Sequence, residues 1–191
     1  MRRSPPIRLI RRLIRDERGV SAVEFALLAP VMIILYAGLV VFCQAYMARK
    51  RAEHVAPMVA DLVAQSSTLT RAEIDGVLAL GPEIMKPYPA AALDVRVSSV
   101  TRTTKDAYKV QWSRTYNGMA ALKDAEAKAL VPADMIAIGE SVVVAESAYD
   151  YTPIFTRNAA LDFLPSGAMH FTQASFLRPR SADVVACSNC G

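Results

Sequence analysis

The sequence predicts an α+β protein in which a long N-terminal transmembrane helix continues into a small periplasmic domain with a roughly three-stranded antiparallel sheet. Three observations lead to this prediction. Residues 25–43 contain no charged side chain. Apolar residues then recur every three or four positions to about residue 66, which is the spacing of a helix with one buried face. Beyond residue 90, three stretches have the composition and periodicity of β-strands.

The uncharged stretch, FALLAPVMIILYAGLVVFC, is long enough to cross a membrane. Its 19 residues, at about 1.5 Å of rise per residue, nearly match the ~30 Å hydrocarbon core of a bilayer. A helix of this length without a polar face is difficult to bury in a small domain. We therefore expect a transmembrane helix over residues 20–45 and a helical extension over residues 46–66.

Basic residues are concentrated before this stretch. Residues 1–19 hold seven of the 22 Lys and Arg residues and two of the 18 Asp and Glu residues, so the remainder carries a formal charge of about −1. A nucleic-acid partner is therefore not expected. Basic flanking residues stay preferentially in the cytoplasm, and only Arg49, Lys50 and Arg51 follow the stretch closely. We expect a single-pass protein of the inner membrane, with a cytoplasmic N-terminus and a periplasmic C-terminal domain.

One acidic residue, Glu24, interrupts the apolar sequence that begins at Val20. An ionised carboxylate costs about 2.5–3.5 kcal/mol at the bilayer centre and less near the interface, so one interpretation places Glu24 among the lipid headgroups. The other interpretation starts from Gly19, an accessible and unbranched site for a peptidase. Cleavage after Gly19 would give Val20 a free amine one helical turn before Glu24, on the same face.

The motif around these residues carries a family resemblance. In RDERGVSAVEFALLAPVMIILYAGLVVF, a glycine is followed by four residues, then Glu24 and Phe25, at the start of an apolar helix. This pattern resembles the class III signal of type IV prepilins, and more closely the TadE/TadG-like (TadE/TadF-type) pseudopilins of the tight-adherence (Flp) pilus system.

The resemblance implies a function and a set of partners. Residues 1–19 would be a basic leader, removed by a prepilin peptidase at the Gly19–Val20 bond, and Glu24 with Phe25 would serve recognition or assembly. The chain would be a minor pilin or pseudopilin that works with other pilins or pseudopilins and with the pilus assembly platform, or with related secretion machinery.

Residues 67–155 are expected to form the periplasmic α+β domain. A capping box at residues 70–73 predicts a short helix after it. Two alternating stretches, 93–100 and 108–114, predict a hairpin, and 141–151 predicts a third strand. Three consecutive valines in the third strand indicate a central position in the sheet. The hairpin residues expected to face one core are Leu93, Val95, Val97, Tyr108, Val110 and Trp112.

The last part of the chain, residues 156–191, is expected to be a loop-rich tail because prolines and glycine interrupt it. It ends in Cys187-Ser188-Asn189-Cys190. In an oxidising compartment these two cysteines are candidates for a structural or tethering disulfide. Whether they pair with each other stays open, because Cys43 is a third thiol.

No motif for catalysis is found. His54 and His170 lie in unrelated contexts, and the Cys-x-x-Cys lacks the strand and helix that lower a thiol pKa in redox enzymes. We expect no enzymatic activity, no cofactor and no metal. Two other functions compete with the pilin interpretation: an uncleaved, membrane-anchored periplasmic scaffold or binding module of an envelope complex, and a protein secreted with an ordinary signal peptide.

Overall fold

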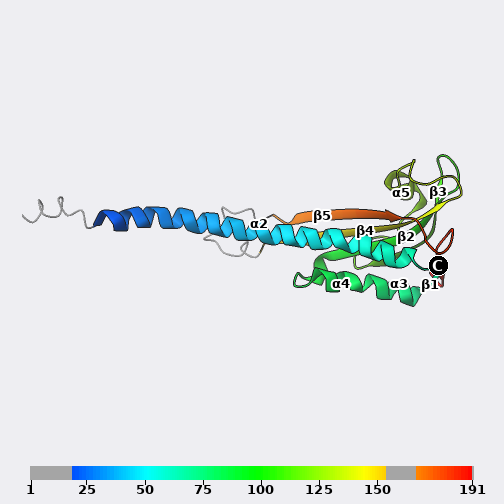
Figure 1. The fold of residues 1–191 in the computed structure, drawn as a ribbon, viewed down its shortest axis with the longest axis horizontal. Coiled ribbons are helices and arrows are strands. Elements are labelled where there is room, and N and C mark those ends of the chain that lie inside the picture. Colours follow the sequence, from blue (N-terminus) through cyan, green and yellow to red (C-terminus); the bar gives the residue numbers. More distant parts are fainter. Residues whose placement is uncertain (1–18, 154–166, 191) are drawn as a thin grey trace, which may run out of the picture. The chain divides into compact units, whose positions relative to one another are not determined.

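The computed structural model describes residues 19–153 and 167–190 (Figure 1). The chain divides into two compact units, residues 1–43 and 44–191. Helix α2 (Val20–Ala64) begins in the first unit and ends in the second. This confirms the predicted long helix. The proposed leader, apart from Gly19, lies outside the described residues.

The second unit is an α+β domain, as predicted. In chain order, its further elements are β1 (Thr68–Thr70), α3 (Arg71–Leu78), α4 (Leu80–Met85), the short 3-10 helix η2 (Ala90–Ala92), β2 (Leu93–Arg102), β3 (Tyr108–Tyr116), α5 (Asp124–Leu130), β4 (Ser141–Tyr151), β5 (Met169–Leu177) and β6 (Ala186–Ser188). The predicted capping box is present at the start of α3, where the side chains of Thr70 and Glu73 each bond the other residue's backbone N–H.

The main sheet has four strands in the order β3-β2-β4-β5, and all three pairs are antiparallel. The β2–β3 hairpin and the central position of β4 agree with the prediction. The prediction of a roughly three-stranded sheet is wrong by one strand. Strand β5 lies in the segment expected to be loop-rich, and it pairs with β4 over nine residues. Without β5, one edge of the buried strand β4 would leave its N–H and C=O groups unpaired.

Both faces of the sheet are covered, which explains the consecutive valines of β4. Val143 belongs to the core formed with α2, α3 and α4, whereas Val142 and Val144 belong to a second core formed with α5 and the loops around it. Successive residues of a strand point to opposite faces. A strand buried on both faces therefore needs apolar residues at every position.

A β-bulge changes the predicted pattern of β3. The register with β2 shifts between Ser99 and Val100, so that Val100 pairs with Val110 and Ser99 pairs with Trp112. Trp112 therefore lies in the α2 core, whereas Tyr108 and Val110 lie in the α5 core. The prediction that these three residues face one core is wrong, because the extra residue of a bulge reverses the alternation after it.

The C-terminal part of α2 packs on the sheet with small side chains. Its buried residues are Ala45, Ala48, Ala52, Val55, Ala56, Val59, Ala60, Val63 and Ala64. Their size allows the helix to approach closely, and the Ser147 hydroxyl of β4 donates to the Ala52 carbonyl at 2.9 Å. This contact fixes the helix against the middle of the sheet.

The C-terminal residues close the far end of α2. The backbone N–H of Arg180 donates to the Ala64 carbonyl at 2.8 Å, and the Ser181 hydroxyl donates to the Gln65 carbonyl at 2.7 Å. Strand β6 then pairs with β1 in parallel. The tail described over residues 167–190 is therefore an integral part of the domain, contrary to the prediction that it is mostly loop.

Candidate functional site

The candidate processing site lies at the first turn of α2. Gly19 is exposed and precedes Val20, the first residue of the helix. Space is open around Gly19, since a Cβ added there would meet no atom within 4 Å. The Gly19–Val20 bond thus lies at an accessible position.

The two candidate recognition residues, Glu24 and Phe25, lie one turn into α2. Both side chains are exposed, Phe25 by 72%. Among the described residues, none forms an ion pair or hydrogen bond with the Glu24 carboxylate. The structure therefore places Glu24 on the helix surface, four residues after Val20, where a partner from outside this chain could reach it.

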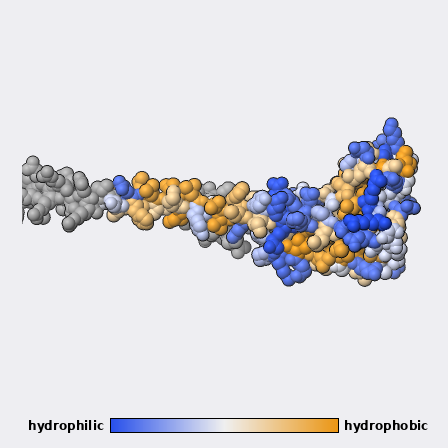
Figure 2. Space-filling model, viewed as in Figure 1, coloured by the Kyte–Doolittle hydropathy of each residue, from blue (hydrophilic) through white to orange (hydrophobic). Residues whose placement is uncertain are grey.

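Beyond Glu24, the helix is apolar on all sides from Phe25 to Tyr36. Six consecutive residues from Val31 to Tyr36 are exposed, and six residues cover more than one full turn of a helix. Figure 2 shows the hydrophobic residues along this part of α2. The exposed large apolar side chains from residue 23 to residue 42 are Val23, Phe25, Leu27, Leu28, Val31, Met32, Ile33, Ile34, Leu35, Tyr36, Leu39 and Phe42.

A surface of this kind is unfavourable in water. By its length and composition, α2 is able to cross a membrane. It is thus compatible with a single-pass membrane protein, and a helix that is apolar all round is the form expected in lipid or in a helix bundle.

The domain holds the C-terminal part of α2 through polar contacts as well as packing. Arg51 donates from Nη1 to the Ile84 carbonyl at 3.1 Å, and the Tyr88 hydroxyl donates to the Gln44 carbonyl at 3.1 Å. Together with the bond from Ser147 to Ala52, these contacts join three parts of the domain to residues 44, 51 and 52 of the helix. Movement of this part of α2 is therefore coupled to the domain.

Residues 19–61 match the family model of TadE-like proteins. This segment of the chain is therefore similar to TadE-like proteins. TadE-like proteins are a family of pilus-associated structural proteins, not of enzymes. The TadE-like segment includes Gly19, Val20, Glu24 and Phe25, and it ends inside α2, before the first strand. No curated protein and no solved structure shows significant similarity to the chain.

The TadE-like match therefore concerns the helix and not the sheet. The match by itself concerns residues 19–61 and leaves the rest of the chain unassigned. The part of the domain after residue 61 lies outside this match, so it is interpreted from its own structure.

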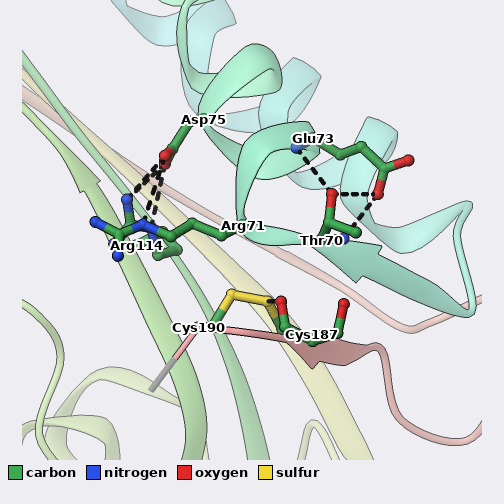
Figure 3. Close-up of polar contacts among 8 residues, drawn as sticks. Thr70, Arg71, Glu73, Asp75, Arg114, Cys187 and Cys190 are labelled. Carbon is green, nitrogen blue, oxygen red and sulfur yellow. Dashed lines mark hydrogen bonds and ion pairs between the residues drawn. A yellow bond between two sulfur atoms is a disulfide. The ribbon is translucent and has the colours of Figure 1, made fainter.

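The two C-terminal cysteines lie next to β1. Cys187 is in β6 opposite Leu69, and the sulfurs of Cys187 and Cys190 form a disulfide with a Cα–Cα distance of 5.7 Å (Figure 3). Both side chains contact the α2 core. The disulfide closes a short loop that holds the end of the chain against β1.

Titratable groups that could perform chemistry are dispersed over the described part of the chain. Residues 19–153 and 167–190 contain no cluster of three or more His, Cys, Asp or Glu side chains suited to a metal ion. His170 contacts Asp150, with 2.6 Å between Nδ1 and Oδ1, and both side chains are largely exposed. Within the described part of the chain, neither side chain of this pair forms a hydrogen bond with a serine, threonine or cysteine.

Sequence reasoning missed the residues that complete the domain. A weak signal for β5 exists, because half-buried Met169 and Phe171 alternate with exposed His170 and Thr172. No pattern in the sequence predicts the contact between Trp112 and the C-terminal tail. The Trp112 indole N–H donates to the Val185 carbonyl at 2.8 Å across 73 residues of sequence. Only the fold brings these two groups together.

Proposed function

We propose that this chain is a minor pilin or pseudopilin, a structural or assembly subunit of a tight-adherence (Flp) pilus or of related secretion machinery. One observation carries the proposal: a helix begins directly after Gly19, with Glu24 at its fifth residue and exposed large apolar side chains after it, inside a TadE-like segment. The leader would be removed by a prepilin peptidase. Other pilins and the assembly platform would be the partners.

The proposed location is the inner membrane. Seven arginines precede the apolar part of α2. Because basic flanking residues stay preferentially in the cytoplasm, these arginines favour a cytoplasmic N-terminus. The domain would then lie in the periplasm. This compartment suits the Cys187–Cys190 disulfide, because thiols are kept reduced in the cytoplasm.

Cleavage would also change the electrostatics around Glu24. Residues 1–19 carry seven arginines, one aspartate and one glutamate, so their loss removes a side-chain charge of +5. It would also create an amine on Val20. Residues four apart on a helix are neighbours on one face, so this amine could pair with Glu24 of the same chain or of a neighbouring subunit.

The cleavage proposal predicts a mature chain that starts at Val20. Mass spectrometry of the membrane-extracted protein, from cells with the pilus machinery, should give the mass of residues 20–191. Gly19→Arg should abolish processing, because a large side chain replaces the glycine at the scissile bond. Gly167→Arg is the matched control, since Gly167 is also exposed with open space around it, and processing should continue.

Other masses would support the competing functions. An intact N-terminus in the presence of the peptidase would indicate an uncleaved scaffold or binding module of an envelope complex. A start after residue 43 would indicate an ordinary secretion signal. If Gly19→Arg is processed like the wild type, the proposed site is wrong.

Assembly should depend on the Glu24 carboxylate. In Glu24→Ala, cleavage should largely persist while incorporation into the pilus complex, measured by co-purification with other pilins, falls strongly. The reason is that the variant keeps the Gly19–Val20 bond but loses the partner of the new amine. Ser21→Ala, another exposed position in the same turn of the helix, serves as control. Normal assembly of the Glu24→Ala protein would remove the role proposed for Glu24.

A further inference from the structure

A groove with a volume of about 670 Å³ opens in the domain beside Gln44. Its walls come from residues 87–92 and from the end of β4, and the Gln44 side of α2 completes it. Three tyrosines line it, namely Tyr88, Tyr149 and Tyr151, together with prolines and alanines, and Asp150 adds one carboxylate. The groove is therefore mainly apolar, with polar atoms at a few positions.

The tyrosines are held in fixed positions around Gln44. The Tyr88 hydroxyl donates to the Gln44 carbonyl at 3.1 Å, and the Tyr151 hydroxyl donates to the Gln44 side-chain oxygen at 3.4 Å. The rings of Tyr88 and Tyr151 pack edge to face, with centroids 6.1 Å apart. Burial raises the pKa of Tyr149 and of Tyr151, so both phenols stay neutral and the groove carries no phenolate charge.

The place of Gln44 in the chain sets the depth of the groove in a membrane. This step rests on the proposed function, in which the apolar part of α2 spans the bilayer. Gln44 directly follows Cys43, the last residue of the uncharged stretch. That stretch extends about 28 Å as a helix, against ~30 Å for the hydrocarbon core, and the headgroup layer adds about 5–8 Å on each side. Groove walls that touch Gln44 thus lie at the level of the headgroups.

The side chains around the groove suit that layer. Tyrosine is enriched at membrane interfaces because its ring is apolar and its hydroxyl is polar. Lys86 directly precedes the groove residues and is exposed. Lys50 lies six residues after Gln44 on α2, outside the groove lining, over the exposed Tyr46 ring with Nζ 5.8 Å from the centroid. Lys50 and Lys86 each have a glutamate partner, so phosphate groups would share these cations with carboxylates.

We propose that this groove, which we call the tyrosine groove, binds a phospholipid of the outer leaflet, with the glycerol and upper acyl region against the tyrosines and the phosphate toward Lys86. A lipid is the occupant that the chain itself brings to the groove, because the membrane begins one residue before Gln44. Binding there would hold the domain on the membrane surface and limit its tilt relative to the membrane.

Photo-crosslinking of the full chain in vesicles of phosphatidylethanolamine and phosphatidylglycerol tests this proposal. Benzoylphenylalanine is placed at one of three exposed positions: Ala91 in the groove, Ile138 elsewhere on the domain, and Leu35 in the apolar part of α2. After irradiation, mass spectrometry of the intact protein counts lipid adducts. We expect adducts at Leu35 and at Ala91, and several-fold fewer at Ile138.

A second substitution sharpens the test. Pro89→Asp puts a carboxylate in the groove wall at an exposed position, and it should lower the adduct yield at Ala91 several-fold without changing the yield at Leu35. Pro132→Asp, at an exposed position outside the groove, should leave both yields unchanged. Loss of the Ala91 adduct in both proline variants would overturn the assignment to the groove.

The remaining outcomes separate the groove from the membrane span. Adducts at Leu35 with none at Ala91 overturn the lipid site and leave the proposed membrane protein intact. Chain-to-chain crosslinks at Ala91 in place of lipid adducts overturn it in favour of a second copy. Equal yields at Ala91 and Ile138 overturn its specificity. Absence of adducts at Leu35 overturns the membrane span itself.

Discussion

The two parts of helix α2 are both rich in apolar residues, but these residues lie in different environments. Between residues 23 and 39, the large side chains of leucine, isoleucine, valine and phenylalanine are exposed, and Val41 is the first valine of this stretch to be buried. From Ala45 onward, the buried positions are alanines and valines, and the outer face carries charged residues such as Arg49 and Lys50. Large side chains exposed all round require an external apolar environment, whereas a one-sided stripe of small side chains requires only the sheet of its own domain.

This comparison shows that hydrophobicity alone does not say what a helix packs against. The size of the apolar residues and the presence of a polar face distinguish the two parts. A substitution with the same chemistry should therefore have different consequences in each part.

The largest expected effect is on the buried part. Val59 is completely buried against the sheet, so Val59→Asp would place an unpaired carboxylate in the core. We expect a loss of about 4 kcal/mol or more in the free energy of unfolding. Denaturant titration of the full chain in detergent, followed by Trp112 fluorescence, measures this.

The control for this variant is the next residue toward the N-terminus. Met58→Asp introduces the same charge at a side chain that is 48% exposed, and should change stability by about 0.5 kcal/mol or less. Equal losses in the two variants would contradict the one-sided packing of this part of α2.

The second effect concerns the exposed part of the helix. Leu35→Asp should leave the unfolding of the domain unchanged, because Leu35 lies in the other unit and is exposed. In a membrane the same change should cost about 3 kcal/mol of insertion free energy. The membrane-bound fraction of the chain, measured by flotation with vesicles, should fall. Leu35→Ala is the control, and unchanged flotation of Leu35→Asp would contradict a central position in the bilayer.

The smallest expected effect concerns the hydrogen bonds that cap helix α3, which are local and do not depend on core packing. Thr70→Ala removes the side chain that caps α3 and should cost about 1 kcal/mol at neutral pH. The Thr70 backbone N–H and then its hydroxyl hold the pKa of Glu73 below its usual value. A lowered carboxyl pKa stabilises the fold above the unfolded pKa, and this contribution is lost as the pH falls through the folded pKa.

The stability difference between the wild type and Thr70→Ala should therefore shrink in acid, below the usual pKa of glutamate near 4.5. Denaturant titrations at neutral and acidic pH measure the change. Thr104→Ala, at an exposed position in the β2–β3 turn, should show no pH-dependent difference. A Thr70→Ala difference that is constant across this range would show that the hydroxyl bond to Glu73 does not contribute.

Prediction from the sequence succeeded where signals are local. The long helix, the capping box at Thr70, the β2–β3 hairpin and the central strand β4 follow from residue spacing within one element. The TadE-like segment could also be identified from a short motif, because Gly19, Glu24 and Phe25 lie within seven residues. Their role in cleavage and assembly stays a prediction.

The sequence alone determined which part of α2 is apolar all round and where the helix begins, because charge, side-chain size and spacing are local properties of the chain. The tertiary structure decided the fourth strand, the separation of Tyr108 and Trp112 into different cores, and the closure of α2 by the C-terminal tail. These features depend on contacts between residues that are far apart in the sequence. In each case the structure is set by the partner with which a backbone group pairs, and not by the type of the residue.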